Sequence, residues 1–118
     1  MFSAHFKDFG GVITASEGYS SGTTDFKAQL TKIIAAAPDA IYIPAYDNDI
    51  GLITLQSREL GFKGVFLGSD GWDSEKTIEL GKTAVEGAYF TNHFSKDDTR
   101  DVVKKFVAAY TKKFNVAP

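Results

Sequence analysis

The stretch that decides the fold is VFLGSDGWDS at residues 65–74, in which a short apolar run ends at two glycines. An apolar run of this length is typical of a buried strand, and Ser74 is a favourable N-cap for a following helix. Open α/β sheets bind ligands at the ends of their strands. The pattern therefore places Asp70 and Trp72 at a sheet edge of the kind that recognises ligands. A polar turn between a strand and a helix is the simpler interpretation.

The sequence on either side alternates between strand and helix patterns. The clearest amphipathic helix is the last, because apolar residues recur at helical spacing between Val102 and Phe114 while lysines occupy the other side. Helices are expected at residues 2–9, 24–37, 48–60, 74–80 and 102–114, and strands at residues 12–16, 40–43, 65–67 and 87–91. This order predicts an α/β fold: a parallel sheet with helices on both faces, a three-layer sandwich joined by right-handed crossovers.

The amino-acid composition limits the classes of protein to which this chain can belong. The chain has 118 residues, of which 43% are hydrophobic and 24% charged, with a net charge of -2, as expected of one soluble globular domain. Its 13 basic and 15 acidic residues are scattered, so we expect no nucleic acid partner. There is no cysteine, and residues 1–6 lack the pattern of a signal peptide. We expect no insertion into a membrane.

The sequence shows no arrangement of residues that is typical of catalysis. His5 and His93 lack the nearby partners of a zinc site, and no glycine-rich phosphate loop is present. Ser69 lacks the spacing of a nucleophile elbow, and the acid pairs at residues 47–49 and 97–98 lie in turn-like stretches. We therefore expect a protein that is not an enzyme, with no metal, no cofactor and no catalytic residue.

Three stretches together resemble one family. They are TDFKAQLTKI at residues 24–33, LGSDGWDS at residues 67–74 and VEGAYFTNHFS at residues 85–95. They resemble the type I periplasmic solute-binding proteins, in the branch that serves branched-chain amino acid ABC transporters. Members have two α/β lobes around a cleft and lie in the periplasm or outside the cell. The resemblance implies that residues 1–94 form a partial second lobe and residues 95–118 a crossover and terminal helix.

The resemblance also assigns ligand-binding residues. It implies that Asp70 takes the α-ammonium of an amino acid and that Tyr46 lines the cleft, with Trp72 and Tyr19 as weaker candidates at neighbouring strand ends. Physical reasoning supports the first two, because residues that follow consecutive parallel strands meet at one edge of the sheet. An ammonium held between an aromatic ring and a carboxylate gains cation–π and charge-assisted hydrogen-bond energy.

The expected function is extracytoplasmic binding of leucine-, isoleucine- or valine-like amino acids for ABC-transporter uptake, with an ABC permease as partner in the intact family. A partial lobe is expected to bind weakly or not at all. The alternatives are a sensory or regulatory ligand-binding domain and a flavodoxin-like interaction module without a ligand.

The resemblance further implies that the family's first strand of this lobe is absent from this sequence, with its place between residues 12–16 and 40–43. Unpaired strand edges favour association. We expect a first lobe or a second chain to complete the sheet, with a homodimer as the leading form. The alternative is a monomer in which four strands close up and the last helix docks beside Phe2 and Phe6.

Overall fold

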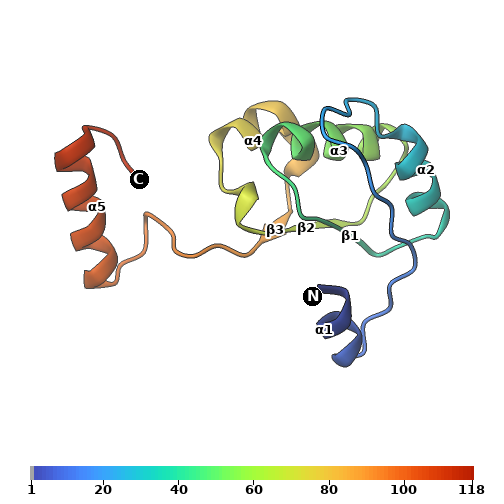
Figure 1. Ribbon diagram of the computed structural model, residues 1–118, viewed down its shortest axis with the longest axis horizontal. Coiled ribbons are helices and arrows are strands. Elements are labelled where there is room, and N and C mark those ends of the chain that lie inside the picture. The colour runs from blue at the N-terminus through green and yellow to red at the C-terminus, as the bar shows by residue number, and fades with distance from the viewer. Residues whose placement is uncertain (1) are drawn as a thin grey trace.

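Three parallel strands form the centre of the computed structural model, which describes residues 2–118. They lie in the order β1-β2-β3, and in the register Ala40 is opposite Val65 and Leu67 is opposite Tyr89. The strands are β1 (Ala40–Ile43), β2 (Val65–Gly68) and β3 (Tyr89–Phe90). Because each strand is joined to the next through a helix, all three run the same way (Figure 1). The predicted parallel α/β sheet is confirmed.

All five predicted helices are present, with ends shifted by a few residues. They are α1 (Phe2–Asp8), α2 (Lys27–Ala35), α3 (Asp47–Glu59), α4 (Glu75–Gly81) and α5 (Asp101–Phe114). Two short 3-10 turns follow β2 and α4, namely η1 (Asp70–Trp72) and η2 (Lys82–Val85). The expected N-cap at Ser74 is confirmed, because its hydroxyl accepts a hydrogen bond from the Lys76 N–H.

Helix α2 begins later than the sequence predicts, because a side chain from α3 holds its first turn. The amide oxygen of Gln56 accepts a hydrogen bond of 2.7 Å from the Phe26 N–H, and the amide nitrogen donates one of 2.8 Å to the Thr24 carbonyl. The Asp25 carboxylate accepts from the Lys27 N–H at 3.0 Å. The chain before Lys27 is therefore fixed in a non-helical form.

The core lies between the sheet and helices α2, α3 and α4, which cover one of its faces (Figure 1). Side chains alternate across a strand, so Ile41 and Ile43 face this core together with Phe66, and all three are buried. Each such side chain contributes about 1.5–3 kcal/mol when it leaves water. Helix α1 reaches the second face, where Phe2 stacks on Tyr42 with ring centroids 3.9 Å apart.

The predicted strand at residues 12–16 is wrong. The segment carries the alternating pattern of a strand, since Gly11, Ile13 and Ala15 are half-buried while Val12 and Thr14 are exposed. No backbone hydrogen bond joins it to another described segment, and a groove of about 730 Å³ lies between it and β1. A strand exists only where a neighbour satisfies its backbone groups. The alternative in which four strands close up therefore does not occur.

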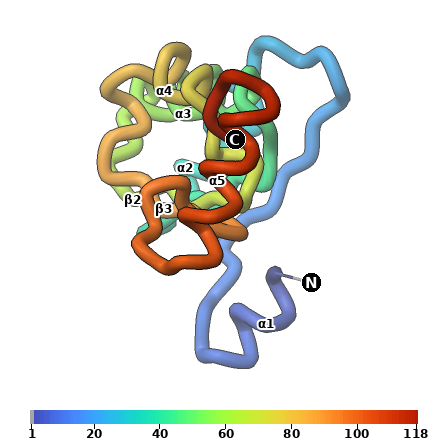
Figure 2. The backbone as a smooth tube through the Cα atoms, turned by 90° about the vertical axis from the view of Figure 1, so that its left-hand side faces the viewer, coloured from blue at the N-terminus to red at the C-terminus, as the bar shows by residue number. Residues whose placement is uncertain are grey.

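Helix α5 stands away from the sheet at the end of an extended arm, residues 91–100 (Figure 1). It is far from α1, which lies below the sheet in Figure 1 and below the rest of the chain in Figure 2, so the alternative in which the last helix docks beside Phe2 and Phe6 is wrong. Its aromatic rings contact one another and Phe94 of the arm, edge-on or tilted, with centroid distances of 5.5 Å from Phe94 to Phe106, 5.9 Å on to Tyr110 and 4.6 Å on to Phe114. Phe106 and Phe114 remain about half exposed.

The close approach of Gly68 to Trp72 gives a first prediction. A Cβ atom at residue 68 overlaps the indole ring, which is 4% exposed and cannot move without disturbing the core. We expect Gly68→Ala to lower the free energy of unfolding by about 1–3 kcal/mol. Urea denaturation, followed by the fluorescence of the single tryptophan, measures this change.

The matched control is Gly18→Ala, because a Cβ atom at residue 18 meets nothing within 4 Å. This control is expected to change stability by less than about 0.5 kcal/mol. Equal stabilities of the two variants would contradict the packing described for Trp72.

Candidate functional site

The carboxyl ends of β1 and β2 bring Tyr46 and Asp70 to one edge of the sheet. Tyr46 is the N-cap residue of α3, and Asp70 opens the η1 turn two residues after β2. Gly71 lets the two loops touch, because a Cβ atom there overlaps the Ala45 carbonyl oxygen and lies 3.1 Å from Cδ1 of Tyr46. The shared edge expected for Tyr46 and Asp70 is present. Their contact with a ligand stays a prediction.

Both side chains are open to solvent. Tyr46 is 78% exposed, and the side chain of Asp70 is 61% exposed. Neither is used in the core: the phenol ring is open to a second molecule, and the carboxylate keeps most of its surface exposed beside its contact with His93. Exposed groups in water bind weakly, since solvent screens the charge. The edge therefore presents one wall of a site without enclosing it.

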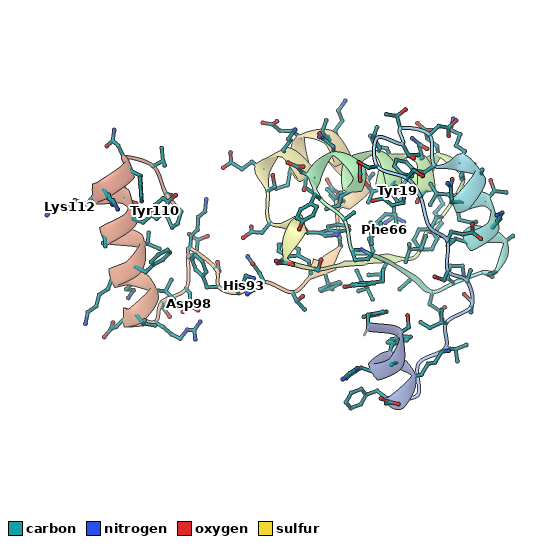
Figure 3. All side chains as sticks on the ribbon, viewed as in Figure 1. Tyr19, Phe66, His93, Asp98, Tyr110 and Lys112 are labelled. Atoms are coloured by element: carbon teal, nitrogen blue, oxygen red, sulfur yellow. The ribbon has the colours of Figure 1, made fainter. Side chains whose placement is uncertain are left out.

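His93, which no sequence pattern assigned to this site, lies beside Asp70. Its Nε2 atom is 3.4 Å from Oδ2 of Asp70, and its side chain is 83% exposed. His93 lies near the start of the arm that leads from β3 to α5 (Figure 3). The place of His93 could have been predicted from the sequence, because this residue follows the third parallel strand and so belongs to the same edge of the sheet.

The first residues of the arm are fixed against the η1 turn. The Asn92 amide donates hydrogen bonds to the Asp73 carboxylate and, at 3.0 Å, to the Phe94 carbonyl. With the His93–Asp70 contact, this makes two links between the arm and the loop that follows β2. The position of Asp70 therefore depends on the segment after β3.

Trp72 is packed in the interior of the protein. Its side chain is buried at 4% exposure, and its indole N–H donates a hydrogen bond of 2.8 Å to the Ile43 carbonyl at the end of β1. The ring thus links the ends of β1 and β2 and holds the η1 turn in place. Its proposed contact with a ligand stays a prediction, and in this arrangement the indole is enclosed by the protein.

Tyr19 lies at the same edge but is already engaged. Its hydroxyl donates a hydrogen bond of 2.9 Å to Asp49 in the first turn of α3, and its ring stands edge-on to Phe26 at 5.0 Å. Burial, followed by the hydrogen bond to Asp49 and the charge of that carboxylate, raises the pKa of Tyr19 to about 12. The hydroxyl is therefore protonated at neutral pH and fixes the loop before α2.

The edge is rich in carboxylates. Asp47 and Asp49 lie in the first turn of α3, and Asp70 and Asp73 flank the η1 turn. The cationic side chains recorded near them are Lys76, 4.0 Å from Asp47, and His93 when it is protonated. A surplus of negative charge attracts a cationic group. The chemistry of this edge therefore suits the ammonium end of an amino acid better than its carboxylate end.

Within residues 2–118, no three His, Cys, Asp or Glu side chains lie close enough together to hold a metal ion. Each helix of the same range is too short or too polar to cross a bilayer.

Comparison with known proteins identifies the family. The family model described as periplasmic binding protein matches residues 2–118. The chain is 29% identical over 89 residues to a Leu/Ile/Val-binding protein homolog 3 of Brucella melitensis, covering 75% of this chain and 24% of that protein. It is 33% identical over 99 residues to an amino acid binding protein of Pseudomonas aeruginosa, covering 78% of this chain and 26% of that protein.

Solved structures that are similar to this chain belong to the same class of binding protein. A leucine binding protein LivK from Thermotoga maritima superposes with a TM-score of 0.86 at 42% identity, covering 99% of this chain and 33% of that one. The substrate binding protein LivJ from Streptococcus pneumoniae, solved in complex with isoleucine, gives a TM-score of 0.77 at 30% identity, covering 99% of this chain and 34% of that one.

The chain spans about a quarter of the length of these curated relatives and about a third of the solved structures. The relatives are solute-binding proteins and not enzymes, which agrees with the absence of a catalytic pattern in the sequence. Sequence, fold and relatives thus lead to one assignment: the chain belongs to the periplasmic binding protein family, type I, in its branched-chain amino acid class, and represents part of one lobe.

Proposed function

We propose that this chain supplies one wall of an amino-acid-binding cleft, in which Asp70 takes the ligand's α-ammonium and Tyr46 lines the cleft. The observation that carries the proposal is the placement of an exposed carboxylate and an exposed phenol ring on two touching loops at one sheet edge. The acidic surroundings described above favour a cation at this position.

The binding energy that such a site can provide depends on how well the site is closed off from water. An ammonium beside a carboxylate forms a charge-assisted hydrogen bond, and it gains cation–π energy when it also lies over an aromatic ring. Removing one partner of such a pair in a closed, dry site costs about 2–5 kcal/mol. At about 1.4 kcal/mol per tenfold, this equals roughly thirty-fold to several thousand-fold in affinity. In the open edge seen here, water reduces the effect.

The ligand class that we propose is a leucine-, isoleucine- or valine-like amino acid. The names of the relatives support this, since they include Leu/Ile/Val-binding proteins and a protein solved with isoleucine. The wider role is uptake through an ABC transporter, with an ABC permease as partner and a periplasmic or extracellular location. The opposite wall of the cleft comes from a first lobe or from a second chain. In this proposal residues 1–94 form the partial lobe and residues 95–118 lead out of it.

The first test is the affinity of the chain alone. Because one wall leaves the ligand in contact with water, we expect leucine to bind with a dissociation constant in the millimolar range or weaker. Titration calorimetry and shifts of the amide resonances of residues 70–73 measure it. Micromolar binding of leucine by a monomer would contradict the proposal of a half site.

A second test separates the role of Asp70 from general surface charge. We expect Asp70→Asn to weaken leucine binding about two- to five-fold in the open edge, as the loss of an exposed pair of about 0.5–1 kcal/mol implies. 4-Methylpentanoate, which lacks the ammonium, is expected to bind both forms equally. Amide chemical shifts at millimolar ligand measure both affinities.

The matched control is Asp97→Asn, which removes an exposed carboxylate from the arm. It is expected to leave leucine binding unchanged. If Asp97→Asn weakens binding as much as Asp70→Asn does, the effect belongs to net charge and the assignment of Asp70 fails.

A further inference from the structure

His93 lies where the proposed function places the ligand's ammonium. Its Nε2 atom is 3.4 Å from Oδ2 of Asp70. A protonated imidazole offers the carboxylate an N–H donor and a positive charge, and an α-ammonium offers the same two things. A cation beside a carboxylate also weakens the attraction of that carboxylate for a second cation. The imidazole and an ammonium therefore compete for Asp70.

The contact between His93 and Asp70 can be exchanged at small cost. The two side chains are 83% and 61% exposed, and the imidazole takes no part in the core. Their separation of 3.4 Å is longer than the length of about 2.7–2.9 Å that is usual for a charge-assisted hydrogen bond. Ion pairs that are this exposed contribute little to stability, because water screens them. An incoming ammonium can therefore take the place of the imidazole without disturbing the fold.

The backbone around His93 is held separately from its side chain. The Asn92 side chain accepts a hydrogen bond of 2.8 Å from the His93 N–H and donates one of 3.0 Å to the Phe94 carbonyl. The same amide donates to the Asp73 carboxylate, which ties this part of the arm to the η1 turn. None of these hydrogen bonds uses the imidazole. The ring can therefore turn away from Asp70 while the backbone that carries it stays in place.

Asp70 differs in its partner from the neighbouring carboxylates. Asp49 and Asp73 accept hydrogen bonds from an uncharged hydroxyl and an uncharged amide. The other cation recorded at this edge, Lys76, belongs to α4 and lies 4.0 Å from Asp47. Asp70 is thus the carboxylate whose recorded partner is a side chain of the arm that can carry a charge.

We propose that His93 sets the affinity of this site for the ligand's α-ammonium: its imidazolium pairs with Asp70 in the ligand-free chain and gives way to the ammonium on binding. This role rests on the proposed function, in which Asp70 takes the ammonium, and it adds the residue that the ligand displaces. Asp70 then has a cationic partner both before and after binding. A carboxylate without a partner is costly wherever water is excluded, so such an exchange suits a cleft.

The test compares variants of the full chain that differ in charge at residue 93. Arginine is always protonated, so His93→Arg keeps a cation beside Asp70 and is expected to weaken leucine binding about two- to five-fold. His93→Gln keeps an N–H donor without a charge, and it is expected to bind leucine more tightly than the parent, by up to about the same factor. Amide chemical shifts at millimolar leucine measure the three affinities.

The chain offers a matched control, because it has one other histidine, His5, which lies in α1. His5→Arg and His5→Gln make the same changes in net charge and are expected to bind leucine like the parent. 4-Methylpentanoate, which lacks the ammonium, gives a second control. His93→Arg is not expected to weaken its binding, whereas a general distortion of the site would weaken the binding of both ligands.

The imidazole itself reports the exchange. We expect the side-chain nitrogen resonances of His93 to shift when leucine is added and those of His5 to stay in place. 4-Methylpentanoate is expected to leave both sets unchanged. In the ligand-free chain, Asp70→Asn is expected to shift the His93 resonances, and this measurement does not require leucine to bind.

The outcomes separate this inference from the proposed function. If Asp70→Asn weakens leucine binding while both His93 variants bind like the parent, the exchange is wrong and the proposed function stands. If neither the Asp70 variant nor the His93 variants change binding, the role of Asp70 fails and the exchange fails with it.

Two further results would overturn the exchange alone. Weaker leucine binding in His93→Gln would mean that the imidazole holds Asp70 in place for the ligand and does not compete with it. Unchanged His93 resonances in ligand-free Asp70→Asn would mean that the two side chains are not in contact in solution.

Discussion

The hydrogen bond from the Trp72 indole to the Ile43 carbonyl, at 2.8 Å, is the interaction on which the candidate site depends. It joins the end of β1 to the turn that follows β2, and the absence of a side chain at Gly68 makes room for the ring. With the indole in place, the η1 turn lies against the loop of Tyr46 through Gly71. Asp70 and Tyr46 share one edge because β1 and β2 are paired parallel strands, and the buried tryptophan holds the turn that carries Asp70 against the end of β1.

A second constraint is that extended backbone becomes a strand only beside another strand. Residues 40–43 and 65–68 have each other, and the result is a regular ladder. Residues 12–16 have the same side-chain alternation but no neighbour, so they remain an extended segment beside a groove. Side-chain patterning selects which face of a segment is turned inward, whereas hydrogen bonds between segments decide whether a sheet forms.

Sequence reasoning predicted the features that local patterns encode. Helix periodicity located all five helices, the apolar runs located β1 and β2, and the order of elements gave the parallel sheet that places Tyr46 and Asp70 together.

Three features were not predicted from the sequence, because they depend on contacts between residues far apart in the chain. Gln56 sets the start of α2 from about thirty residues away, Trp72 is enclosed through a carbonyl on another strand, and His93 meets Asp70 only after the chain has passed through α4 and β3. A single sequence carries no sign of which pairs will meet, so local rules assigned Trp72 to a ligand and left His93 without a role.

The groove beside β1 and the candidate site share one element. The lining of the groove ends at Pro44, two residues before Tyr46, and β1 leads directly into the loop that carries the phenol ring. A strand inserted along β1 would order this loop from the side opposite β2 and add a further strand end to the acidic edge. Completion of the sheet would therefore also affect the proposed amino-acid site, through residues 44–46. In the chain alone, this loop is supported on the η1 side only, where Gly71 meets Ala45 and Tyr46.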